Sequence, residues 1–207
     1  MIASSMQTLP EPYQSLFEAI IRDCGDEAID KFKQSGADLN YCNPNTGRTP
    51  LSTATLAKRV KAVEALLKHG ANPNQKFTYR SPMDGHVEAD CVALHYASTA
   101  ETAVALIRAG ADVNSADASG TTPLMRAAFH GHAAVVSALL SAGASSLARQ
   151  HERRGLKAHT ARELAESKVE FWREAACENP EGSEQRRLHY EAICDILLAA
   201  ERGIVAT

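Results

Sequence analysis

The chain has 207 residues, of which 44% are hydrophobic and 23% are charged, and its formal net charge is −3. This composition is ordinary for a soluble chain, and the small negative charge argues against nucleic acid as a partner. No stretch approaches the roughly 20 apolar residues of a membrane span, and the start of the sequence lacks the features of a signal peptide.

Residues 14–42 predict two short helices, because apolar residues recur at helical spacing on both sides of Gly25. The segment closes with a turn at 36–40, Gly-Ala-Asp-Leu-Asn. Its outer face is rich in acidic residues, as expected for the terminal unit of a stack. We expect residues 1–13 to form a poorly ordered lead-in.

Residues 43–76 repeat this plan more completely. Thr49-Pro50-Leu51 opens the first helix, a second apolar stripe follows, and Gly70 begins the closing turn. Gly36 and Gly70 are 34 residues apart, which suggests an internal repeat.

Residues 77–116 form a less regular unit. The segment 76–80 carries strand-like residues, and Asp84-Gly85 is a turn signal, so a β-hairpin is expected before the first helix. Residues 92–97 open the helical part, and the turn at 110–114 closes it.

Residues 117–149 form the most regular unit. Thr122 is a good N-cap, Pro123 occupies the first helical position, and Gly131 suits a reversal that needs positive φ. Two valines and two leucines then form one apolar stripe, which Gly143 ends. Two short antiparallel helices cannot bury this stripe alone, so neighbouring units must stack on it.

These residues match a known repeat position by position: Thr122-Pro123-Leu124, Ala127-Ala128, Gly131-His132 and Gly143-Ala144. The chain resembles an ankyrin-repeat protein. The resemblance implies an all-α ankyrin-repeat solenoid of about five stacked helix-turn-helix units with β-hairpin fingers, one of them enlarged. It covers a single domain at 14–203, with a tail at 204–207 and units at 14–42, 43–76, 77–116, 117–149 and 150–203.

The last unit, 150–203, is degenerate. Residues 160–165 resemble a terminal variant of the Thr-Pro-Leu motif, and the helix is expected to run through Val169 and Trp172. Residues 178–182 should break it, and a final charged helix should seal the stack.

The resemblance implies that fingers and first helices form a concave surface that binds a protein partner. The predicted partner-binding residues are Arg48, Leu56, Phe77, Tyr79, Arg80, Met83, His86, Tyr96, Arg126, Phe129, His130, Arg149, Arg153 and Arg154.

Two segments permit more than one interpretation. Compared with 117–149, unit 77–116 has ten more residues before its first helix and three fewer in that helix or its turn. The insert is either a neutral surface loop or, given its aromatic, Met and Arg residues, a binding finger. The basic segment 149–162 is either a solvated loop or a patch that meets an acidic surface.

The sequence predicts no catalytic residue, metal site or cofactor. His130-Gly131-His132 belongs to the repeat turn and has no third ligand at suitable spacing. The resemblance gives His95 a hydrogen bond to the neighbouring finger backbone. The five scattered cysteines lie in no nucleophile motif, which predicts packed or idle thiols in a reducing cytoplasm.

Three functions remain open, of which the leading one is non-enzymatic protein binding by a chain that is monomeric when free. By analogy with small ankyrin proteins, the chain would inhibit or regulate its partner, for example a cognate effector enzyme or a toxin. The alternatives are an adaptor or self-associating scaffold, and, least favoured, an enzyme. No nucleic acid or membrane is expected as a partner.

Overall fold

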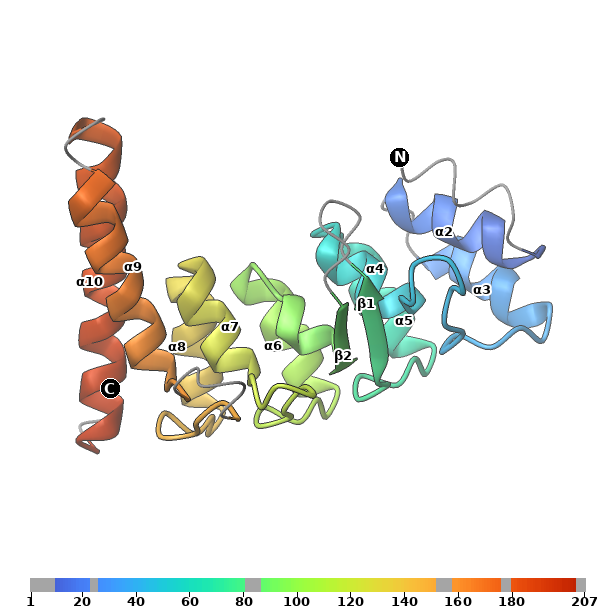
Figure 1. Cartoon of the computed structure of the whole chain (residues 1–207). Coiled ribbons are helices and arrows are strands. Elements are labelled where there is room, and N and C mark those ends of the chain that lie inside the picture. Colours follow the sequence, from blue (N-terminus) through green and yellow to red (C-terminus); the bar gives the residue numbers. More distant parts are fainter. Residues whose placement is uncertain (1–9, 23–25, 81–86, 152–157, 176–179, 204–207) are drawn as a thin grey trace. The chain divides into compact units, whose positions relative to one another are not determined.

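The structure is a computed structural model that describes residues 10–22, 26–80, 87–151, 158–175 and 180–203. It is mostly helical and divides into two compact units, Met1–Asp112 (unit 1) and Val113–Thr207 (unit 2) (Figure 1). Among the described residues, no helix is long and apolar enough to cross a membrane.

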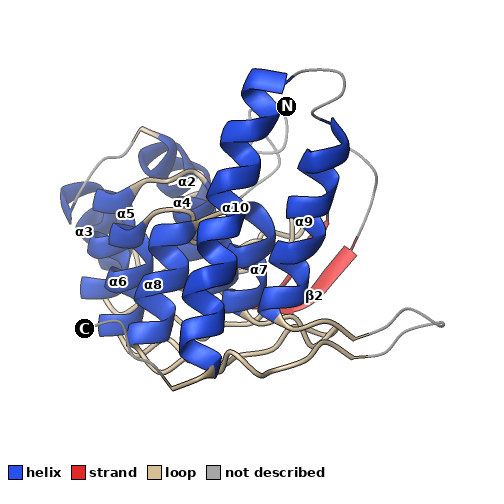
Figure 2. Cartoon of the chain, turned by 90° about the vertical axis from the view of Figure 1, so that its left-hand side faces the viewer, coloured by secondary structure: helices blue, strands red, loops and turns tan. Residues whose placement is uncertain are grey.

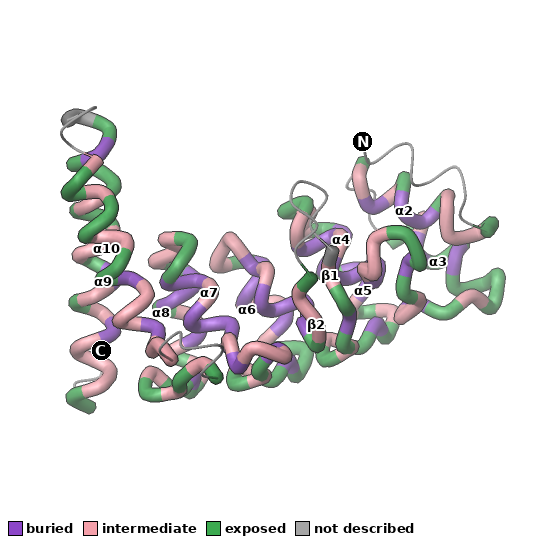
Figure 3. The backbone as a smooth tube through the Cα atoms, viewed as in Figure 1, coloured by how far each residue is buried: buried purple, intermediate pink, exposed green. Residues whose placement is uncertain are grey.

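The described part of unit 1 consists of three successive pairs of helices. Their bounds are α2 Tyr13–Ile21, α3 Asp26–Gln34, α4 Pro50–Leu56, α5 Val60–Lys68, the 3-10 helix η1 Ala93–Tyr96, and α6 Ala100–Arg108. The first helices α2, α4 and η1 pack on one another in sequence order, and so do the second helices α3, α5 and α6. Leu16, Leu51 and Leu66 are among the buried residues of its core. Figure 3 shows that buried positions recur along the helices of this unit.

A β-hairpin separates α5 from η1. Strands β1 (Phe77–Arg80) and β2 (Val87–Cys91) pair antiparallel, with Tyr79 opposite Glu88 and an irregularity between Phe77 and Tyr79. The strand-like residues of the insert therefore form β1, whereas the predicted turn at 84–85 lies outside the described residues.

Among the residues described in unit 2 there are two pairs of helices, and the second pair is much longer than the first. The bounds are α7 Pro123–His130, α8 Ala133–Ser141, α9 Ala161–Ala175 and α10 Pro180–Glu201. Helix α9 packs on α7, and α10 packs on α8 and α9. Figure 2 shows α9 and α10 extending beyond the ends of α7 and α8.

Local signals set the starts and ends of the regular helices. The hydroxyl of Thr49 accepts the Ser52 N–H at 3.1 Å, and that of Thr122 accepts the Met125 N–H at 3.3 Å. A proline follows each threonine at the first turn. Gly131 ends α7 with a φ of 77°, so the predicted N-cap and positive-φ turn are confirmed.

The fingers of the regular repeats are closed by a buried residue that acts as a local acceptor. In unit 1, the side-chain oxygen of Asn43 accepts the Asn45 N–H at 2.9 Å. In unit 2, Asp117 accepts the N–H groups of Ser119 and Thr121 at 2.8 and 2.9 Å. Each finger thus satisfies its own backbone within a few residues.

Asparagines of the closing turns link one repeat to the next. In unit 1, Asn40 accepts the Asn72 N–H and Asn74 accepts the Asp112 N–H, both at 2.8 Å. In unit 2, Asn114 accepts the Ser145 N–H at 2.8 Å. These bonds tie successive turns at the same position of the repeat, a role that the sequence alone did not reveal.

Three predicted helix boundaries can be compared with the structure. The shortened first helix of the third unit is confirmed, because η1 has only four residues, 93–96. The predicted break between the last two helices is confirmed, because α9 ends at Ala175 and α10 begins at Pro180, inside the predicted segment 178–182. Pro180 opens α10, where its missing N–H is tolerated. The lead-in is shorter than expected, since Tyr13 opens α2 and stacks on Tyr41 with ring centroids 3.9 Å apart. The boundaries of the five repeats stay predictions.

Candidate functional site

In unit 1, predicted contact residues from three separate segments lie together. The Arg48 guanidinium carbon is 4.5 Å from the centroid of the Tyr79 ring. That ring meets Tyr96 edge-on at 5.8 Å, and the Tyr96 hydroxyl donates to the Glu88 carboxylate. Arg48 comes from the finger before α4, Tyr79 from β1 and Tyr96 from η1. The hairpin brings these segments into contact, and we call these three residues the finger cluster.

The depth of each side chain decides what it can contact. Arg48, Tyr79 and Tyr96 are half-buried, as is Leu56 at the end of α4. Phe77 is only 4% exposed and packs on Tyr96 with ring centroids 5.6 Å apart. Its prediction as a contact residue is corrected, because Phe77 is a core residue beneath the finger cluster.

In unit 2, Phe129 and His130 are exposed at the end of α7, with ring centroids 5.3 Å apart. The Lys168 ammonium lies 4.0 Å from the centroid of the Phe129 ring. This end of α7 therefore presents an aromatic surface with a cation placed on it.

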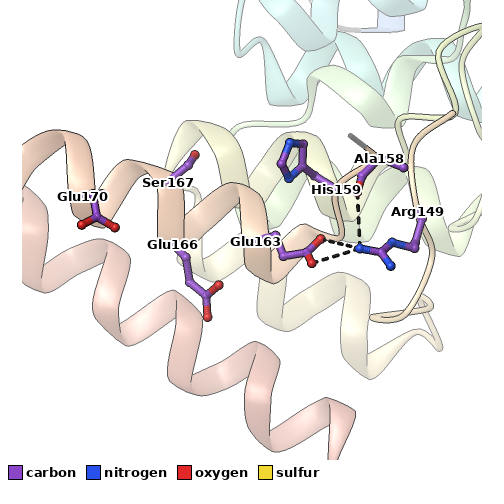
Figure 4. A pocket seen from close by; sticks show the side chains of 7 residues that line it. All are labelled: Arg149, Ala158, His159, Glu163, Glu166, Ser167 and Glu170. Carbon is purple, nitrogen blue, oxygen red and sulfur yellow. Dashed lines mark hydrogen bonds and ion pairs between the residues drawn. The ribbon is translucent and has the colours of Figure 1, made fainter. Parts of the chain in front are cut away.

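Arg149 is exposed but already has partners. It donates to both oxygens of Glu163, at 3.0 and 3.1 Å, and to the Ala158 carbonyl at 3.3 Å (Figure 4). The Thr160 N–H donates to Glu163 at 2.7 Å, and this bond, reinforced by Arg149, lowers the pKa of the Glu163 carboxyl. The Glu163 carboxylate is therefore ionised at neutral pH, and its bonds tie Arg149 to the first turn of α9.

Arg126 does not point outward as predicted. Its side chain is 12% exposed and pairs at 3.4 Å with Asp117, whose side chain is 4% exposed. Asp117 belongs to the finger at 117–121 and Arg126 to α7, so the pair holds the finger against α7. Arg126 therefore positions the finger rather than offering a free cation to a partner.

Several predicted residues cannot be placed. Met83, His86, Arg153, Arg154 and the side chain of Arg80 lie outside the described residues. Their contact with a partner stays a prediction.

A cleft beside Arg149 has an acidic lining (Figure 4). Glu163, Glu166 and Glu170 follow one another along α9, and each lies next to an arginine. The pairs are Arg149–Glu163, Arg162–Glu166 and Arg173–Glu170. Each glutamate of the lining is therefore already paired with an arginine.

The side chains of His95, Cys42 and Cys194 could take part in chemistry but are held in environments that do not activate them. His95 is 2% exposed, and its Nδ1 accepts the Val92 N–H at 3.1 Å, which caps η1 locally. Its predicted bond to a neighbouring finger stays a prediction. Burial raises the pKa of Cys194 to about 11 and also raises that of Cys42, so neither thiol is activated. The described part of the chain contains no group of three side chains suited to a metal ion.

Known families match most of the regular repeats. A model of ankyrin repeats in three copies matches residues 83–150, and a single ankyrin-repeat model matches residues 46–76. This chain is an ankyrin-repeat protein. The mostly helical structure fits the all-α repeat fold of that family.

Curated relatives contain the same repeats within longer proteins. The chain is 39% identical over 75 residues to mouse 2-5A-dependent ribonuclease, which covers 36% of this chain and 10% of that protein. It is 36% identical over 96 residues to mouse ankyrin repeat and SOCS box protein 6, covering 45% and 21%. It is 34% identical over 109 residues to human SH3 and multiple ankyrin repeat domains protein 2, covering 51% and 5%. The chain thus spans less than a quarter of the length of these relatives.

These matches show a protein-interaction module. The ankyrin repeat is generally a non-enzymatic interaction fold, although one relative is named a ribonuclease.

Proposed function

We propose that this ankyrin-repeat protein binds a protein partner through its fingers and first helices, and that binding inhibits or regulates that partner. The observation that carries the proposal is the finger cluster of Arg48, Tyr79 and Tyr96. Tyrosine and arginine are enriched among residues that dominate binding energy. Half-buried side chains already held by ring contacts also lose little conformational freedom on binding.

Unit 2 supplies a second contact surface in this proposal. Phe129 and His130 are exposed on its first helix, and Arg149 extends from the following finger. Leu56 on α4 is the unit 1 equivalent of Phe129, and we include it. The insert at 75–91 is then a binding finger rather than a neutral loop.

The inhibitory role is the finer part of the proposal. A partner such as an effector enzyme or a toxin would lose activity when its working surface is covered. The support is analogy with small ankyrin proteins that act by binding alone. We further propose a monomeric free state in a reducing cytoplasm, which the free thiols of Cys42 and Cys194 support.

Affinity capture with the full chain tests the binding surface. Tagged wild-type protein is incubated with native cell extract, co-eluting proteins are identified by mass spectrometry, and the purified partner is titrated. Tyr79→Ala should weaken binding about 30-fold, the effect of roughly 2 kcal/mol. Lys61→Ala is the control, because Lys61 is exposed on second helix α5. Loss of binding with Lys61→Ala but not with Tyr79→Ala would place the interface on the other face.

The inhibitory role has its own test. The purified partner is assayed with saturating wild-type chain, and its activity should fall in proportion to occupancy. If binding is retained while activity is unchanged, the chain is an adaptor. Light scattering at several concentrations then distinguishes a monomer from a self-associating scaffold.

A further inference from the structure

The last helix pair of unit 2 is longer than the pair on which it packs. Helices α9 and α10 have 15 and 22 residues, whereas α7 and α8 have 8 and 9. At about 1.5 Å per residue, α10 is roughly 33 Å long and α8 roughly 14 Å. The buried residues of α9, Ala161 and Ala165, lie in its first two turns. Farther along the pair, Phe171 and Leu188 are 54% and 53% exposed.

Two cations lie on aromatic rings in this region. The Lys168 ammonium is 4.0 Å from the centroid of the Phe129 ring and 5.6 Å from that of Phe171. The Arg186 guanidinium carbon is 4.6 Å from the centroid of the Trp172 ring. We call these five residues, Phe129, Lys168, Phe171, Trp172 and Arg186, the cationic–aromatic patch. They come from α7, α9 and α10 of unit 2.

The two cations of the patch differ from their neighbours in charge pairing. Arg173 pairs with Glu170 at 3.6 Å, and Arg187 pairs with Glu191 at 2.6 Å. By contrast, Lys168 and Arg186 form no ion pair with any carboxylate of the described residues.

A shallow cleft continues the patch between the end of α7 and α10. It is lined by His130, Gly131, Trp172, Gln185, Arg186, His189 and Tyr190. None of these is acidic, so an approaching carboxylate meets the Arg186 cation and aromatic edges without repulsion inside the cleft.

We propose that the cationic–aromatic patch binds an acidic segment of a partner protein, in which a carboxylate side chain neighbours an apolar one. The carboxylate would pair with Arg186 or Lys168, and the apolar side chain would cover Phe171. Ring contacts already order both cations, which reduces the conformational entropy lost on binding. The inference rests on the proposed function in one respect, that the partner is a protein.

The surroundings of the patch favour a short acidic segment over a nucleic acid. Glu170, Glu174 and Glu184 are exposed on the same two helices. A long polyanion would meet these carboxylates on either side of two cations, whereas a short peptide would avoid them. The cations also cover rings on which bases would otherwise stack.

The fluorescence of Trp172 reports directly on the patch, because this is the only tryptophan of the chain. The full chain is titrated with a short peptide of alternating glutamate and leucine, with the same peptide carrying glutamine for glutamate, and with short oligothymidylate. The glutamate peptide should give a saturable change. Arg186→Gln should weaken this binding about tenfold. Arg173→Gln, a paired cation of α9, should leave it within about twofold.

The proposal is overturned if the glutamate peptide gives no saturable change, or if the glutamine peptide binds equally well. Equal weakening of peptide binding by Arg173→Gln also overturns the proposal, because the lost affinity would then reflect only the overall charge of the chain. Tighter binding of oligothymidylate would assign the patch to nucleic acid instead. If the glutamate peptide does not bind while partner capture still depends on Tyr79, only the proposal for the cationic–aromatic patch is wrong. If the peptide binds but partner capture does not depend on Tyr79, the proposed binding surface at the finger cluster is wrong, whereas the proposal for the patch is retained.

Discussion

The two units add residues to the repeat in different places. Unit 1 places its extra residues in a finger, where β1 and β2 form a hairpin above a first helix reduced to η1. Unit 2 places them in the helices α9 and α10 of its last pair. The finger insertion leaves the stacking of α4, η1, α5 and α6 intact. The helix extension instead leaves apolar side chains such as Phe171 without cover.

The two units therefore illustrate two ways in which extra residues in a repeat can make a binding surface. A hairpin pairs its own backbone, and its side chains then join residues already present in the stack, as Tyr79 joins Arg48 and Tyr96. An extended helix also satisfies its own backbone, but its outer turns have no neighbouring pair to pack on. Exposed aromatic residues there are available to a partner.

The largest expected effect compares the packed and projecting parts of α10. Ile193 is fully buried, so Ile193→Ala should lower the free energy of unfolding of unit 2 by about 3–4 kcal/mol. Leu188 is 53% exposed, and Leu188→Ala should cost less than about 0.5 kcal/mol. Urea denaturation followed by circular dichroism measures both. Equal losses would mean that the outer turns of α10 also pack on something.

The second prediction concerns the close contact in unit 1 between Gly47, in the finger before α4, and strand β1 of the hairpin. Gly47 has a φ of +70°, and a Cβ there would overlap the backbone oxygen of Thr78 in β1. Gly47→Ala should therefore destabilise unit 1 by about 3 kcal/mol, from left-handed strain plus displacement of the strand. Gly36→Ala is the matched control, with a φ of +76° and open space around it, and should cost about 1 kcal/mol. If the two substitutions cost the same, the hairpin does not depend on this contact.

The third prediction concerns the regular finger of unit 2. Asp117→Ala removes an acceptor of the Ser119 and Thr121 N–H groups and one partner of Arg126. The expected loss of stability is about 2 kcal/mol, measured by thermal and urea unfolding. Asp195→Ala, at an exposed carboxylate of α10, is the control and should change stability by less than about 0.5 kcal/mol. A loss as small as that of the control would show that the finger is held by its stacking alone.

The smallest change in stability is expected at two equivalent turns, one in each unit. Lys58 adopts a φ of 57° where unit 2 has Gly131 with a φ of 77°. Lys58→Gly should stabilise unit 1 by about 1 kcal/mol, because a non-glycine side chain is strained in this conformation. The reciprocal Gly131→Ala should destabilise unit 2 by at least as much, since its Cβ would also lie 3.1 Å from Tyr190. Differential scanning calorimetry compares the two variants, and a destabilised Lys58→Gly would contradict the strain argument.

Much of the fold could be predicted because its signals are local. The N-cap at Thr122 and the positive φ of Gly131 depend on neighbours within a few residues, and both appear as expected. The missing turn before α6 was visible as a difference in spacing and appears as η1. The exact start of α10 within the predicted break could not be read from the sequence, because a proline is compatible either with a helix end or with a first helical turn.

Less of the candidate site could be predicted, because contact residues depend on how segments pack. Phe77 and Tyr79 are similar in sequence terms, yet only Tyr79 reaches the surface, while Phe77 lies 4% exposed beneath it. The irregular pairing of β1 lies between these two residues. Lys168 and Arg186 were not predicted at all, because a helical pattern does not show where the neighbouring helix ends.

The sequence by itself determined the repeat, the helix starts at Thr49-Pro50 and Thr122-Pro123, and the membership of the chain in the ankyrin-repeat family. Those features arise from backbone caps, fixed proline φ values and apolar periodicity, which act over one or two turns. Only the tertiary structure decided which polar groups are already paired, as for Arg126, and which cations lie on aromatic rings, as for Arg186. These outcomes depend on side chains that helix packing brings together from distant positions in the sequence.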